Sequence, residues 1–106
     1  MKTEVYKSIY GWKAETHIDL GNDQELHFTT MKRSNGVTVT NANVVRVSDG
    51  MCSFVVFQDY SEAILSEKLG RVTEKAVREQ HQKALLRLEE VKAKVRAHYV
   101  AKGVAL

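Results

Sequence analysis

Polar and apolar residues alternate through much of the stretch between residues 11 and 58, as expected of strands with one buried face. Turn signals interrupt this pattern: GND at 21–23, NG at 35–36 and DG at 49–50. Asn-Gly and Asp-Gly are strong hairpin signals, because type I′ turns need positive φ at both central residues. The pattern therefore predicts a four-stranded antiparallel meander over about residues 11–58.

The turns also predict a register for the strands. A three-residue loop at 21–23 pairs Ile18 with Leu26. If the NG and DG turns are two-residue loops, they pair Ser34 with Val37 and Ser48 with Met51, respectively. Carried through, this register collects the apolar side chains on one face: Trp12, Ala14, Ile18, Leu20, Leu26, Phe28, Val37, Val39, Val45, Val47, Cys52, Phe54 and Val56.

Asn41 and Asn43 are unexpected on this face, because they interrupt a row of valines. The predicted register places them close to Thr30 and Gln58. Buried amides need hydrogen-bond partners, so we favour a hydrogen-bonded ladder or a β-bulge that turns the asparagines outward. The alternative is a polar ligand pocket formed by Thr30, Asn41, Asn43 and Gln58.

Helical spacing replaces the alternation after the sheet. Ser61 is a candidate cap for a short helix over about residues 62–69, and Thr73 for a long helix over about 74–101. The long helix carries an apolar stripe with intervals of three and four residues. We expect the α+β class, with a four-stranded antiparallel meander, a short helix and one long C-terminal helix in a single domain of residues 1–106.

Two features of this arrangement favour a homodimer. A helix of about 28 residues reaches ~42 Å, whereas strands of about nine residues span ~30 Å, so the helix is expected to overhang its sheet. The second sheet face also carries apolar residues that need a cover, either residues 61–70 or another chain. The expected interface comprises Val77, His81, Ala84, Leu88, Val91, Val95 and Tyr99 of the helix with Val55 and Phe57 of the sheet.

Charge is distributed unevenly along the chain. The net charge is +3, but residues 68–102 carry ten Lys and Arg against four Glu. Such a segment is ordinarily a solvated helix face, and it can also collect anions such as nucleic acid. Two helix-spaced rows are candidates for nucleic-acid contact: Arg71, Lys75 and Arg78, and Lys83, Arg87 and Lys94. Aromatic residues interleaved with basic ones would strengthen this reading, but the helix rows lack them.

Other chemistries find little support. The chain has one cysteine, Cys52, and shows no nucleophile motif or Gly-rich phosphate loop, so neither an enzyme nor a cofactor is expected. His17 and His27 face each other near Glu25 and could hold a metal, but we interpret them as a surface pair and expect no metal. The charged start MKTEVYKSIYGWKAE resembles neither a secretory signal nor a membrane span, so we expect a cytoplasmic protein that does not bind membranes.

The favoured function is therefore that of a small non-enzymatic protein, homodimeric, that binds an unknown protein target. A short chain without motifs would suit an accessory or inhibitor protein of a phage or mobile element. The alternative is a nucleic-acid-binding protein that uses the basic C-terminal helix.

Overall fold

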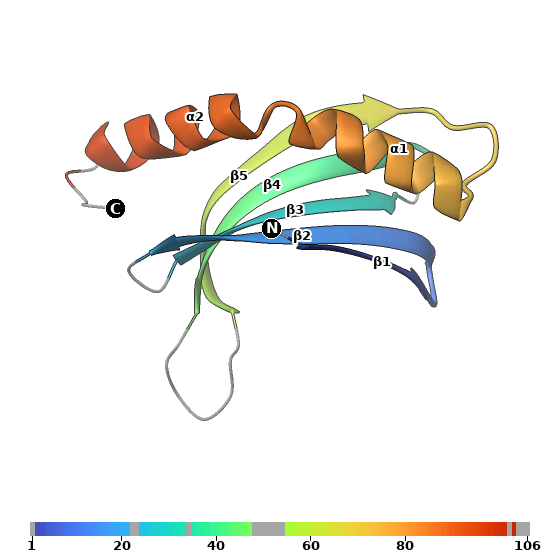
Figure 1. The fold of residues 1–106 in the computed structure, drawn as a ribbon, viewed down its shortest axis with the longest axis horizontal. Coiled ribbons are helices and arrows are strands. Elements are labelled where there is room, and N and C mark those ends of the chain that lie inside the picture. Colours follow the sequence, from blue (N-terminus) through green and yellow to red (C-terminus); the bar gives the residue numbers. More distant parts are fainter. Residues whose placement is uncertain (1, 22–23, 34, 48–54, 102, 104–106) are drawn as a thin grey trace.

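One antiparallel sheet and two helices make up the fold (Figure 1). The structure, a computed structural model, describes residues 2–21, 24–33, 35–47, 55–101 and 103, with the backbone alone for 46–47 and 55–59. The elements in chain order are β1 (Lys2–Ser8), β2 (Gly11–Gly21), β3 (Gln24–Lys32), β4 (Thr38–Val47), β5 (Val55–Glu67), α1 (Glu74–Leu85) and α2 (Leu88–Ala101). The α+β class is confirmed, but the sheet has five strands in the order β1-β2-β3-β4-β5 rather than four.

The predicted register of the first hairpin is confirmed. Ile18 pairs with Leu26, Thr16 with Phe28 and Ala14 with Thr30. The register shifts only at the end of β2, between Asp19 and Gly21. Leu26, Phe28 and Ala14 are fully buried, so the alternation correctly identified the core face of these two strands.

The register of β3 with β4 differs from the prediction by one residue. Met31 pairs with Val39, and the hairpin closes where the Arg33 N–H donates to the Val37 carbonyl (2.8 Å). Three residues therefore separate Arg33 from Val37, and Gly36 supplies the positive φ (+84°) that such loops need. Because side chains alternate with a period of two, this slip exchanges the two faces of β4.

The exchange of faces explains the asparagines. Thr38, Thr40, Ala42 and Val44 are fully buried and point to the core, whereas Asn41 and Asn43 lie on the opposite face. Asn41 pairs with Thr29 rather than Thr30, and with Ala63 rather than Gln58. Both asparagines therefore point away from the core, but the predicted cause is wrong: the unbroken register of β4 on β3 sets their face, and the bulge beside Asn41 adds its extra residue to β5.

The predicted helix over residues 62–69 is wrong, since β5 runs through to Glu67. Thr38 pairs with Glu67, and the register shifts between Thr40 and Asn41 so that Ile64 is an extra residue in the ladder. This bulge breaks the alternation in EAILSEKL, which is why the segment lacks a strand-like pattern. The predicted DG turn at 49–50 lies outside the described residues. The register predicted from it is wrong, because Val47 pairs with Val55, whereas a Ser48–Met51 pairing would place Val47 opposite Cys52.

The predicted long helix is two helices. Thr73 caps α1 as expected, with its side-chain oxygen accepting from the Ala76 N–H (3.1 Å). At Leu86 the α-helical pattern stops, and the Arg87 N–H donates to the Ala84 carbonyl (3.0 Å), three residues back. The break contains neither Gly nor Pro, so no sequence signal marked it.

Both helices pack on the same face of the curved sheet (Figure 1). One buried cluster joins the strands to both helices: Leu26, Phe28, Ala42, Val44, Ile64, Ala84, Val91, Val95 and Tyr99. The helical stripe therefore packs within its own chain, and Val91, Val95 and Tyr99, which we expected to need a second copy, are buried without one. No helix in the described part of the chain is both long and apolar enough to cross a membrane.

Candidate functional site

The tip of the β1–β2 hairpin exposes two large apolar side chains. Ser8 pairs with Gly11, which leaves Ile9 and Tyr10 as the two turn residues. The Tyr10 N–H donates to Ser8 Oγ (3.2 Å), and Ser8 Oγ donates to the Gly11 carbonyl (2.9 Å), so the turn is held by its own hydrogen bonds. Ile9 is 91% exposed and Tyr10 is 75% exposed. Tyr10 thus presents an aromatic ring to solvent from an ordered turn.

Basic side chains surround Tyr10 from two other connections of the fold. Lys32 ends β3, Arg33 begins the β3–β4 connection, and Arg71 lies between β5 and α1. The three connections meet at one end of the sheet, on the right in Figure 1. All three basic residues are exposed, and none of them forms an ion pair with another described residue.

Two neighbouring hollows share Tyr10 and Lys32. One, of ≈ 490 Å³, is lined by Met31 and Arg33 as well, and the other, of ≈ 530 Å³, extends to Arg71. No carboxylate is among the described residues that line either hollow. We call the surface formed by Tyr10, Lys32, Arg33 and Arg71 the basic groove.

The other candidate residues of the first basic row lie on α1. Arg78 donates to Glu74 (3.0 Å) and Lys75 lies 4.0 Å from Glu79. Only Arg71 of this row lines the basic groove. The positive charge of Lys75 and Arg78 is therefore partly offset by carboxylates one helical turn away.

The second basic row is neutralised more fully. Lys83 pairs with Glu67 (3.5 Å), Lys94 with Glu62 (2.8 Å), and the Arg87 Nε with Glu90 (2.9 Å). The Arg87 guanidinium also donates to the Ile64 carbonyl (2.8 Å) and so ties the helix break to β5. The hydrogen bond from Lys94 holds the pKa of Glu62 below its ordinary value, and Tyr60 adds to the effect. Through these contacts, the second basic row joins the two helices to β5.

The predicted dimer residues lie in the core of the single chain. Val77, His81, Ala84, Val91, Val95 and Tyr99 are buried, and Leu88 packs against the same cluster. The side chains of Val55 and Phe57 lie outside those that the structure describes. A seam between two copies along this stripe would require the helices to leave their own sheet.

The predicted polar pocket is divided between the two faces of the sheet. Thr30 is fully buried beneath α1, whereas Asn41 and Asn43 are half-buried on the opposite face. Asn43 Oδ1 accepts a hydrogen bond from Ser61 (2.9 Å). The Gln58 side chain is not among those described. Thr30 and the two asparagines therefore do not line a common pocket.

A buried network of hydrogen bonds replaces that pocket. His81 of α1 contacts Thr16 Oγ1 through Nε2 (2.7 Å) and Thr30 Oγ1 through Nδ1 (2.8 Å). The network continues from Thr16 to Thr3 (2.7 Å) and from Thr30 to Thr40 (2.6 Å). It crosses β1, β2, β3 and β4, so the threonines serve to dock α1 on the sheet.

Sequence reasoning identified Arg71 and missed Tyr10, Lys32 and Arg33. The segment KTEVYKS was not recognised as a strand, so the following Ile-Tyr-Gly was not recognised as a hairpin tip. Two bulky apolar residues directly before a glycine between strands were the available signal. Comparison of the chain with protein families, with curated proteins and with solved structures found no match.

Proposed function

We propose that this chain is a non-enzymatic binding protein that holds single-stranded nucleic acid in the basic groove. The observation that carries the proposal is the exposed ring of Tyr10 among three cations that lack carboxylate partners in the described structure. Single-strand-binding surfaces combine these two elements, because cations follow the phosphates while an aromatic ring stacks on a base. A duplex keeps its base faces inside the helix and could not offer them to Tyr10.

Charge distribution around the groove supports an anionic ligand. The carboxylates that offset the basic helix rows, among them Glu62, Glu67 and Glu90, pair with residues outside the groove. Lys32, Arg33 and Arg71 thus concentrate positive potential at one end of the sheet. Such a patch attracts phosphates over a distance of about one Debye length, ~8–10 Å at ordinary salt.

A protein partner is the second candidate, and Ile9 is the observation that favours it. This side chain is 91% exposed beside Tyr10, and base stacking has no need for an aliphatic residue there. Exposed apolar pairs of this kind commonly anchor protein contacts. A second copy of the chain or an acidic segment of another protein would use the same end of the sheet.

Fluorescence anisotropy with a labelled oligo(dT), a labelled duplex of equal length and a labelled acidic peptide separates these ligands. We expect oligo(dT) to bind most tightly. Tyr10→Phe should retain this binding, whereas Tyr10→Leu should weaken it roughly fivefold to a hundredfold, since stacking on an aromatic contributes about 1–3 kcal/mol per base.

The outcomes that contradict the proposal are equally specific. Equal affinities of the Phe and Leu variants would mean that the aromatic ring does not stack. Binding of the acidic peptide alone, lost in Ile9→Lys, would establish the protein candidate instead. Sedimentation equilibrium of the wild type and of Ile9→Lys tests whether the protein partner is a second copy of the chain.

A further inference from the structure

The sheet face away from the helices carries a polar row that crosses all five strands. The register pairs Lys2 with His17, His17 with His27, His27 with Asn43, and Asn43 with Ser61. No described element covers this face. The two histidines stand at its centre, on β2 and β3.

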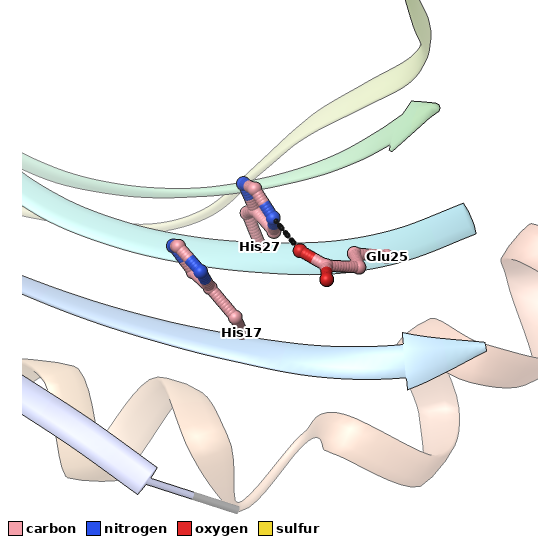
Figure 2. A group of neighbouring side chains, drawn as sticks. All are labelled: His17, Glu25 and His27. Carbon is pink, nitrogen blue, oxygen red and sulfur yellow. Dashed lines mark hydrogen bonds and ion pairs between the residues drawn. The ribbon is translucent and has the colours of Figure 1, made fainter. Parts of the chain in front are cut away.

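His17 and His27 form a close cross-strand pair (Figure 2). Their imidazole rings are stacked, with centroids 3.7 Å apart and an interplanar angle of 9°. Glu25 is two residues before His27, so its side chain emerges on the same face. The Glu25 Oε1 atom lies 2.8 Å from the Nε2 atom of His27. Each of the three residues therefore offers one metal-ligating atom, and these atoms all lie within 4.8 Å of one another.

We propose that His17, Glu25 and His27 bind one divalent transition-metal ion. A set of two imidazole nitrogens and one carboxylate oxygen suits Zn²⁺, Co²⁺, Ni²⁺ or Cu²⁺, whereas Mg²⁺ and Ca²⁺ prefer oxygen ligands. Zn–N and Zn–O bonds of about 2.0–2.2 Å around a tetrahedral ion separate ligand atoms by about 3.3 Å. Binding would require side-chain rotations that end the ring stacking and bring the ligand atoms, now within 4.8 Å of one another, to that spacing.

The ion would take the place of the proton between Nε2 of His27 and Oε1 of Glu25. A neutral His27 then carries its ring proton on Nδ1 with no net loss, whereas a protonated His27 releases one proton to solvent. In both cases the Nε2 lone pair becomes the ligand. Water completes the coordination from the solvent side. A hollow of ≈ 230 Å³, lined by Lys2, Glu4, Glu15 and His17, provides space for it directly beside the histidine pair.

The surrounding charges favour a cation at this point. Carboxylates of Glu4, Glu15, Asp19 and Glu25 share this face with the ammonium groups of Lys2 and Lys13. Lys13 is itself paired with Glu15 (3.3 Å). Lys2 is the cross-strand neighbour of His17, and its ammonium group would swing away from the bound ion. The bound ion would fasten β2 to β3 and stabilise the sheet, on the face opposite α1 and α2.

Isothermal titration calorimetry with Zn²⁺ or Co²⁺ at pH 7.5 tests the site on the full chain. We expect one ion per chain and an increase in Tm with added metal. His17→Asn and His27→Asn should each weaken binding at least about tenfold, since even supporting residues of metal ligands contribute that much. Glu79→Gln is the control: it removes a carboxylate charge from α1, on the opposite side of the sheet, and should leave affinity unchanged.

Imidazole ¹⁵N spectra assign the ion to its ligands. Zn²⁺ should shift the ring nitrogens of His17 and His27 and leave those of His81 and His98 in place. Absence of binding by the wild type, or equal binding by the double variant His17→Asn/His27→Asn, would overturn the proposal. Glu25→Gln leaves both rings intact and should also weaken binding, so the test holds even if a histidine variant does not fold.

Discussion

The Nε2 atom of His81 lies 2.7 Å from the hydroxyl oxygen of Thr16, and neither residue has any exposed surface. This contact joins α1 to the second strand of the sheet. The other ring nitrogen contacts Thr30, so a neutral imidazole, with one donor and one acceptor, satisfies both hydroxyl groups. The histidine that the sequence suggested for a dimer seam instead docks a helix inside the chain.

The burial of His81 predicts a loss of stability in mild acid. Burial lowers the pKa of His81 from 6.5 to about 4, and nearby Glu15 opposes the shift only in part. The unfolded chain therefore binds this proton more readily than the folded chain. The stabilisation is complete above pH 6.5 and is lost as the pH falls toward 4. Between pH 7.5 and 5.0, the free energy of unfolding should fall by about 2 kcal/mol.

Urea denaturation at pH 7.5, 6.0 and 5.0 measures this loss. Carboxylates with lowered pKa, such as Glu62, lose most of their contribution below pH 4.5, so the change between pH 7.5 and 5.0 reports mainly on His81. His81→Gln should be less stable at pH 7.5 and should show a flatter dependence on pH. A wild type equally stable at pH 7.5 and 5.0 would mean that His81 keeps an ordinary pKa.

Neighbouring residues on β4 test the register. Thr40 is fully buried and its hydroxyl lies 2.6 Å from that of Thr30, whereas Asn41 lies on the opposite, uncovered face. Thr40→Val should reduce the free energy of unfolding by about 1–3 kcal/mol, because it leaves buried polar groups with fewer partners. Asn41→Val should change it by no more than about 0.5 kcal/mol. The reverse order, measured by urea denaturation, would favour the register in which Asn41 faces the core.

The loop of the β3–β4 hairpin makes a separate prediction. Gly36 has φ of +84°, and a Cβ there would meet nothing within 4 Å, so the cost of Gly36→Ala is conformational alone. We expect a loss of about 1–2 kcal/mol in the free energy of unfolding. Gly70→Ala is the matched control, since Gly70 has equal space and no positive φ. It should be neutral or stabilise by up to about 1 kcal/mol. Equal effects in thermal denaturation would contradict the hairpin geometry.

The parts of the fold that could be predicted are those where local pattern and turn agree. The pairing of Ile18 with Leu26 followed from the GND turn and from the alternation on both strands. The NG turn was recognised but assigned two residues instead of three, and this one-residue error moved Asn41 and Asn43 to the wrong face. Turn length cannot be read from Asn-Gly alone, because both loop types place a glycine at positive φ.

Other features left no local signal. The strand containing Ile64 has a bulge that removes its alternation, and the break at Leu86 lacks a helix-breaking residue. The basic groove depends on the register and curvature of the whole sheet, since Tyr10, Arg33 and Arg71 come from three different connections. A sequence pattern cannot show that these connections meet.

The salt dependence of oligo(dT) binding tests the proposed function most directly. If each of the three cations neutralises one phosphate, a plot of log K for binding against log [NaCl] should have a slope of about −2. The triple variant Lys32→Ala/Arg33→Ala/Arg71→Ala should bring that slope close to zero. The control Lys83→Ala/Lys92→Ala/Arg96→Ala removes the same charge from the helices and should keep most of the wild-type slope. The proposal is contradicted if the wild type fails to bind at low salt, or if the two triple variants reduce the slope equally.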